Sequence, residues 1–129
     1  MLYIYILIGM FVAVLALFRR ELLIQTDSFR AILAVSTLLF LIGIFLHSTA
    51  AGRNAPSGAL LAPLMSLALY RVTRKLFLLK FRREPRDTFM DWSSGLAWDR
   101  VFNIVYFAGS AWILMAAMIG MRALAKAGW

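Results

Sequence analysis

The sequence contains no cysteine and one histidine, and only 16% of its 129 residues are charged. Without cysteine the chain cannot form disulfides, thiolate metal sites or a thiol nucleophile. His47, with no carboxylate expected on the same helix face, does not complete a metal site or a nucleophile–base pair. A glycine-rich phosphate loop is also missing from the sequence. We therefore expect a protein that is not an enzyme and binds neither a cofactor nor a metal.

Hydrophobic residues dominate the composition of the chain. Hydrophobic residues make up 63% of the chain, and the mean hydropathy is +0.81. Soluble domains are closer to half apolar and a quarter charged. The composition predicts an all-α integral membrane protein, with residues 1–129 forming one polytopic domain. It also favours a bacterial inner membrane over any soluble compartment.

Four apolar segments predict four transmembrane helices, at about residues 2–18, 31–47, 57–72 and 101–121. A helix of seventeen residues reaches about 26 Å, enough for a hydrocarbon core of about 30 Å once flanking side chains extend to the interface. The third segment is the shortest. It contains Pro63, which removes a helical hydrogen bond, so we expect a kink there.

The distribution of basic residues predicts the orientation. With four spans and both termini outside, the inner loops hold eleven of the fourteen Lys and Arg residues, and the outer segments hold Arg53, Arg122 and Lys126. This asymmetry obeys the positive-inside rule, which a three-span arrangement would break. The first segment has Arg19 and Arg20 after it and no basic residue before it. We therefore expect an uncleaved anchor with its N-terminus outside.

The predicted cytoplasmic loop, residues 71–100, concentrates charge. We expect the third helix to continue past Tyr70 as a basic helix and to end because of Pro85. Arg83 or Arg86 is expected to pair with an acid at 87 or 91, and Asp99 to cap the fourth span. The candidate residues for contact with anionic lipid headgroups or with a partner are Arg71, Arg74, Lys75, Arg82, Arg83, Asp87, Asp91 and Trp92. Two roles remain open for these residues. They form either a topology signal whose charges stay at the lipid headgroups or a docking surface for a partner protein. Nucleic acid is excluded, since no recognised binding motif accompanies the charge.

Small residues recur at helical spacing in three of the four segments. Residues of this kind let helix backbones approach closely in lipid, where no hydrophobic force gathers helices. A carboxamide near hydrocarbon also needs a partner, typically on a facing helix. The predicted packing residues are Gly9, Ala13, Ala16, Ala59, Ala62, Ser66, Asn103, Ala116 and Gly120. The pattern does not say whether the packing partner is the same chain or another.

Two functional hypotheses remain. The first is a small non-enzymatic membrane interaction protein, either an accessory subunit of a larger complex or an immunity-type protein, that contacts lipids and another membrane protein or itself. The alternative is a small homo-oligomeric channel or transporter. Neither hypothesis names a partner or a ligand.

Overall fold

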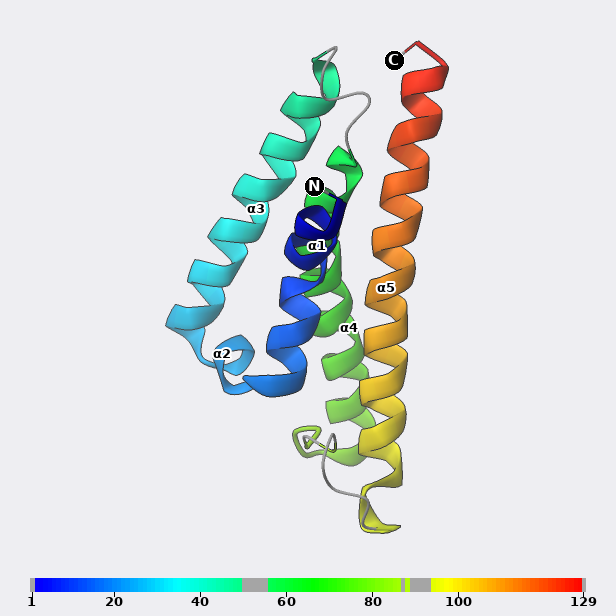
Figure 1. Ribbon diagram of the computed structural model, residues 1–129. Helices are drawn as coiled ribbons and strands as arrows, with labels where there is room; N and C mark the ends of the chain where they lie inside the picture. Colours follow the sequence, from blue (N-terminus) through cyan, green and yellow to red (C-terminus); the bar gives the residue numbers. More distant parts are fainter. Residues whose placement is uncertain (1, 50–55, 87, 89–93, 129) are drawn as a thin grey trace.

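The computed structural model describes residues 2–49, 56–86, 88 and 94–128, and within these residues the chain is helical, as expected. In the described residues, five α-helices and two 3₁₀ segments follow one another, and Figure 1 shows their arrangement. The elements are α1 (Leu2–Phe18), α2 (Glu21–Ile24), α3 (Thr26–Ser48), η2 (Ser57–Leu61), α4 (Ala62–Phe81), η3 (Ser94–Leu96) and α5 (Ala97–Lys126).

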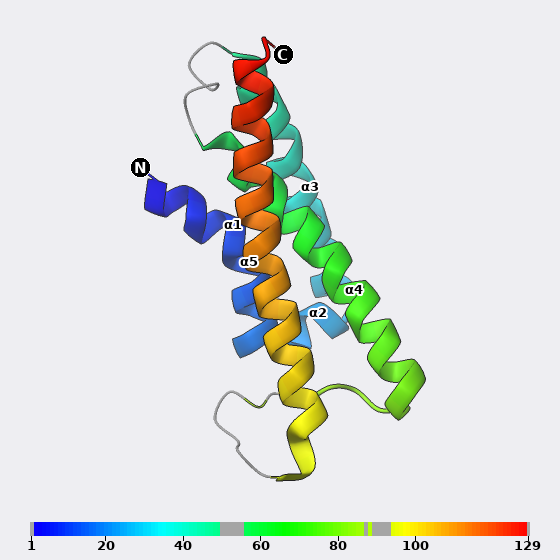
Figure 2. The same cartoon turned by 90° about the vertical axis from the view of Figure 1, so that its right-hand side faces the viewer.

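α4 and α5 run alongside each other, and α1 packs against both (Figures 1 and 2). α3 lies to one side: α2 connects its start to α1, and η2 contacts it further along. The C-terminal ends of α1 and α4 and the N-terminal ends of α3 and α5 therefore share one end of the bundle. We call it the basic end, because both Arg/Lys-rich connections lie there.

Among the residues that the structure describes, two helices are long and apolar enough to cross a membrane, α3 with 23 residues and α5 with 30. The apolar helix α1 has 17 residues. Its bounds match the predicted first segment, whereas α3 begins five residues before residue 31 and α5 extends the fourth segment at both ends. Asp27 and Asp99, each in the first turn of its helix, suit the positive helix N-terminus, which explains the earlier starts.

The third segment differs from its prediction in two places. Pro63 occupies the first turn of α4, where its missing N–H costs nothing, and the five residues before α4 form the 3₁₀ helix η2. A change of helix type thus replaces the expected kink. α4 does continue past Tyr70, but it ends at Phe81, before Pro85 could stop it, because Arg82 adopts a left-handed conformation (φ 53°).

The outer surface of the bundle is apolar over much of its length. Large apolar side chains are exposed along the outside, among them Leu7, Phe45 and Trp112, whose exposed fractions are 69–71%. The interior holds a core of apolar side chains, such as Phe77 and Phe102, together with small residues, two tyrosines and several polar groups, including Ser66 and Asp99, both fully buried. Apolar side chains therefore lie on the outside as well as in the core.

Small residues form the closest contacts between helices. Gly9, Ala13 and Ala16 of α1 are buried, as are Ala59, Ala62 and Ser66 on the facing segment. A Cβ atom at Gly9 would meet the Ala59 carbonyl oxygen at 3.0 Å. On α5, however, Ala116 and Gly120 are exposed. The close approach on α5 falls at the neighbouring position Ala117, where Gly58 of η2 lies against the backbone, so the α5 face predicted from sequence is not the one that packs within the chain.

Replacing Gly58 with alanine should destabilise the bundle. The added Cβ would lie within 3.0 Å of the backbone of Ala117 and Met118, which cannot rotate away, and overpacking of this kind costs roughly 1–3 kcal/mol. We expect Gly58→Ala to lower the midpoint of thermal unfolding in mild detergent. Gly120→Ala is the matched control, because its Cβ would meet nothing within 4 Å. Equal midpoints for the two variants would contradict the proposed contact.

Candidate functional site

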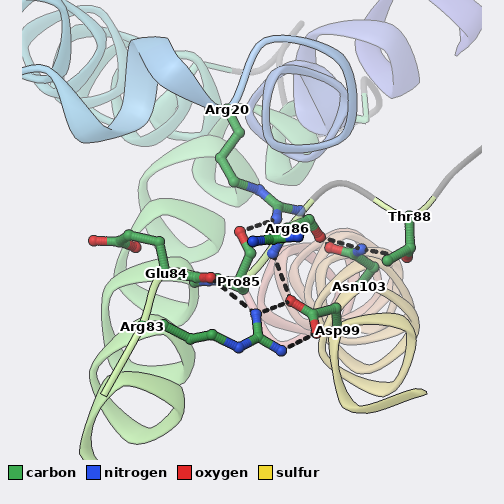
Figure 3. A network of polar contacts seen from close by, with 8 residues as sticks. All are labelled: Arg20, Arg83, Glu84, Pro85, Arg86, Thr88, Asp99 and Asn103. Atoms are coloured by element: carbon green, nitrogen blue, oxygen red, sulfur yellow. Dashed lines mark hydrogen bonds and ion pairs between the residues drawn. The ribbon is translucent and has the colours of Figure 1, made fainter. Parts of the chain in front are cut away.

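A network of buried polar groups joins three parts of the chain at the basic end (Figure 3). It links the residue just before α2, the segment between α4 and η3, and the first two turns of α5. We call this set the polar network; its side chains are those of Arg20, Arg83, Thr88, Asp99 and Asn103.

Asp99 accepts three hydrogen bonds although its side chain is completely buried. Arg83 donates from both terminal nitrogens, Nη1 to Oδ1 at 2.8 Å and Nη2 to Oδ2 at 2.6 Å. The backbone N–H of Arg86 donates to Oδ1 at 2.6 Å. A carboxylate removed from water is stable when it is paired and hydrogen-bonded in this way, and the two-nitrogen contact also fixes its orientation.

Arg83 gains from the same contact. Its hydrogen bonds to Asp99 raise the pKa of the Arg83 guanidinium, and the same contact lowers the pKa of the Asp99 carboxyl, so each group favours the charged form of the other. The Arg83 guanidinium also lies 5.4 Å from the centre of the Phe77 ring. The Arg83 side chain is 39% exposed while Asp99 is fully buried, so the pair runs from the surface into the interior.

Asn103 and Arg20 continue the network toward α1. The Asn103 Nδ2 group donates to Thr88 Oγ1 at 2.8 Å and to the Arg86 carbonyl at 3.3 Å, and its Oδ1 accepts from Arg20. Arg20 is buried and also donates to the carbonyl oxygens of Pro85, at 2.7 Å, and Ala16. All three acceptors of Arg20 are uncharged. Dipolar groups, rather than a carboxylate, therefore surround this buried cation.

Local structure explains how these residues meet. The left-handed turn at Arg82 redirects the chain from α4 across the start of α5, which brings residues 83–86 over Asp99. On α5, Asp99, Asn103, Tyr106 and Ser110 follow the spacing i, i+4, i+7, i+11 of one helix face, and all four are buried. α5 thus turns a polar face inward. Above the network, the rings of Tyr70 and Tyr106 pack edge to face at 5.4 Å.

The sequence-predicted contact residues separate into two groups. Arg74 pairs with Glu84 (Nε to Oε2, 2.8 Å), and Arg83 pairs with Asp99 rather than with an acid at 87 or 91. Arg71 lies 3.8 Å from the Phe29 ring centre and connects α4 to α3. Lys75 and Arg82 are exposed. The remaining three, Asp87, Asp91 and Trp92, lie outside the described residues.

Three residues of the network, Arg20, Thr88 and Asp99, were missed as site residues by sequence reasoning. Asp99 was expected to cap a helix, but α5 begins two residues earlier, so its carboxylate is free to bind Arg83. Arg20 entered the sequence argument only as one of the basic residues that predict the orientation of the chain in the membrane. A signal for Arg20 did exist, because it continues the face of Gly9, Ala13 and Ala16 at the same spacing.

The polar network holds α1, the segment after α4 and the start of α5 together, and its partly exposed member Arg83 reaches the protein surface. Within the described part of the chain, no three His, Asp or Glu side chains come together to hold a metal ion. Comparisons with protein-family models, with curated proteins and with solved structures find no match. The geometry of this chain therefore has to carry the functional argument.

Removing the buried carboxylate should loosen the basic end. Asp99→Asn leaves Arg83 without its anion and turns an amide N–H₂ toward donors, so we expect the thermal midpoint to fall by about 5 °C or more. Glu21→Gln is the matched control. Glu21 pairs with Arg19 at 3.0 Å, but both side chains are at least 60% exposed, and such pairs contribute about 0–1 kcal/mol. A similar midpoint for both variants would refute the role given to Asp99.

Proposed function

We propose that this chain is an integral membrane protein of four spans, with both termini outside, that acts as a non-enzymatic interaction subunit. The apolar outer surface supports the membrane setting. A surface carrying Leu7, Phe45 and Trp112 would be poorly soluble in water but matches acyl chains. A bacterial inner membrane fits the charge asymmetry of the loops.

The shared basic end supports the orientation. Arg20, at the end of the first proposed span, donates to the Pro85 carbonyl in the loop before the fourth span, so both basic connections lie on one side of the bundle. The positive-inside rule then assigns that side to the cytoplasm. Two of the proposed spans are α3 and α5, and the other two are α1 and the segment from η2 into α4.

Single cysteines should report this topology, because the natural chain has none. We expect a membrane-impermeant maleimide added to intact cells to label Ser48→Cys and Ala127→Cys. Ser28→Cys and Gly95→Cys should react only after the membrane is permeabilised. Ser48, Gly95 and Ala127 are exposed and Ser28 is partly exposed, so the reagent can reach each one. Labelling of all four positions in intact cells would exclude the proposed orientation.

α3 carries the proposed interaction. The buried residues of this 23-residue helix are Ser36 and Gly43, so most of its surface is left without a protein neighbour in the described chain. Gly43 lies against η2, where a Cβ atom would meet Leu60 Cβ at 3.0 Å. Such a helix is held by one narrow stripe and leaves its other faces open to a second membrane protein.

A shallow hollow on α3 is the single observation that most favours docking. Its volume is about 450 Å³, and its lining residues are Arg30, Leu33, Ala34, Thr37, Leu38 and Leu41. Ala34 and Thr37, which are small, lie between the larger leucines, and the Thr37 hydroxyl is already bound to the Leu33 carbonyl at 2.8 Å. A small-residue depression of this kind accepts the side chains of an incoming helix.

The basic loop has a narrower role than docking in this proposal. Arg74 and Arg83 are engaged in ion pairs within the chain, which leaves Arg71, Lys75 and Arg82 as the exposed cations of the predicted set, able to contact anionic headgroups. The partner is therefore recognised mainly in the membrane, through α3. The alternative, a homo-oligomeric channel or transporter, predicts a second copy of this chain in the same position.

Photo-crosslinking through residue 38 tests the proposal in the native host. A photoreactive amino acid at Leu38 should join the chain to a different membrane protein, and Ala34→Phe, which fills the hollow, should reduce the product about tenfold. Val35→Phe is the matched control, because Val35 is exposed but does not line the hollow.

The products also separate the two functional hypotheses. A cross-linked dimer of this chain alone, together with ion flux when the purified protein is placed in liposomes, would replace the interaction subunit by the channel. No change with Ala34→Phe would remove α3 as the docking helix.

A further inference from the structure

Two tyrosines lie in the interior of the bundle, one on each of the neighbouring helices α4 and α5. Tyr70 is 0% and Tyr106 is 1% exposed, and the centres of their rings are 5.4 Å apart. Among the described residues, neither hydroxyl oxygen has a hydrogen-bond partner. A buried tyrosine hydroxyl normally has one, because folding removes it from water. These two hydroxyls therefore need a partner that the surrounding chain does not supply.

A serine or threonine hydroxyl can meet the same need within its own helix. Thr37 and Thr73 each donate to the carbonyl oxygen four residues earlier, at 2.8 Å. Ser110 is fully buried and has the same option after a rotation about one bond. Its hydroxyl is close to that of Tyr106, but the two do not reach hydrogen-bonding geometry. A tyrosine hydroxyl stands at the far end of a rigid ring, away from the nearby carbonyls of its own helix, so the tyrosines carry the argument.

Phe102 places both tyrosines beside the polar network. Its ring centre is 6.3 Å from that of Tyr70 and 6.5 Å from that of Tyr106. The Arg20 guanidinium lies 5.6 Å from the centre of the same ring. Asn103 precedes Tyr106 by about one turn on the buried face of α5. The two tyrosines therefore lie about one turn deeper in the bundle than the polar network.

Apolar residues close this region on its other side. Leu114 follows Ser110 by one turn of α5 and packs with Ala59 and Ala62 in a separate buried cluster. Any molecule held between the tyrosines and this cluster is small, because the hydroxyl-bearing side chains around it are at most 1% exposed. It also has to donate and accept hydrogen bonds, since a hydroxyl group does both.

We propose that at least one internal water molecule is bound between the hydroxyls of Tyr70 and Tyr106, with the polar network as its third partner. Buried waters typically make about three hydrogen bonds to polar groups that have no other partner. Bound at this place, the water adds α4 to the helices that the polar network holds together. The inference goes beyond the interaction function proposed above, and it rests neither on the partner of α3 nor on the orientation in the membrane.

X-ray radiolysis footprinting of the purified full chain in mild detergent tests the proposal directly. Brief irradiation splits water into hydroxyl radicals, which oxidise the side chains that contact that water. We expect both tyrosines to be oxidised although they are buried. Tyr106→Phe should reduce the oxidation of Tyr70 about fivefold, because it removes one of the groups that bind the water. Tyr3→Phe is the matched control and should leave it unchanged, since Tyr3 is 79% exposed on α1.

Thermal unfolding of the same variants supplies a second readout. Tyr70→Phe and Tyr106→Phe keep the packed rings and remove only the hydroxyls. We expect each to lower the midpoint by about 3 °C through the loss of a hydrogen bond to water. The double variant should lose less than the sum of the two, because both hydroxyls bind the same molecule.

Three results would overturn the water site. Removal of an unsatisfied hydroxyl from a dry interior leaves the midpoint unchanged or raises it, so either outcome for the single variants would exclude bound water. Strictly additive losses would show that the two hydroxyls share no partner. Lower midpoints without oxidation of Tyr70 would mean that the hydroxyls bind each other directly.

Discussion

The complete burial of the Asp99 carboxylate is the constraint on which the rest of the basic end depends. Leaving a buried carboxylate unpaired costs about 3–5 kcal/mol, a large part of the stability of a typical domain, and Arg83 removes this cost by lying within hydrogen-bonding distance of it. Arg83 can do so only if the chain turns sharply after α4 and crosses the start of α5. That crossing brings the Pro85 and Arg86 carbonyls to Arg20 and Asn103, which attach α1 to the same point.

The helices themselves were largely predictable, because long uncharged segments have few alternatives. The bounds of α1 follow from its apolar residues and the two arginines after it. The start of α4 was not predictable in the same way. Pro63 permits either a kink inside a helix or a place in its first turn, and only the packing of η2 between α3 and α5 selects the second. The left-handed residue at the end of α4 is an arginine rather than the usual glycine, so no local signal marks it.

The candidate site was harder to predict than the fold, because charge counts identify a basic end without identifying its pairs. Exposed arginines and buried ones look alike in a sequence. The informative signal was positional: Arg20 shares a face with the small residues of α1, and Asp99 shares a face with Asn103 and Tyr106. Reading polar residues by helix face would have placed Arg20 and Asp99 inside the bundle. The partners of these two residues were not predictable in this way. Arg20 binds the Pro85 carbonyl and Asp99 binds the Arg86 N–H, and both backbone groups are brought into place by the turn at Arg82.

The inward face of α5 also determines which changes in length this protein can tolerate. One residue inserted between Asp99 and Ser110 would rotate everything beyond it by about 100°. If the insertion fell before Asn103, its carboxamide would turn away from Arg20, which would lose an acceptor, while Ala117 would move off Gly58. A four-residue insertion would nearly restore the angle but shift the contacts by about 6 Å along the axis. Natural relatives of this protein should therefore differ in the side chains of α5 far more readily than in the length of α5 between Asn103, which contacts Arg20, and Ala117, which contacts Gly58.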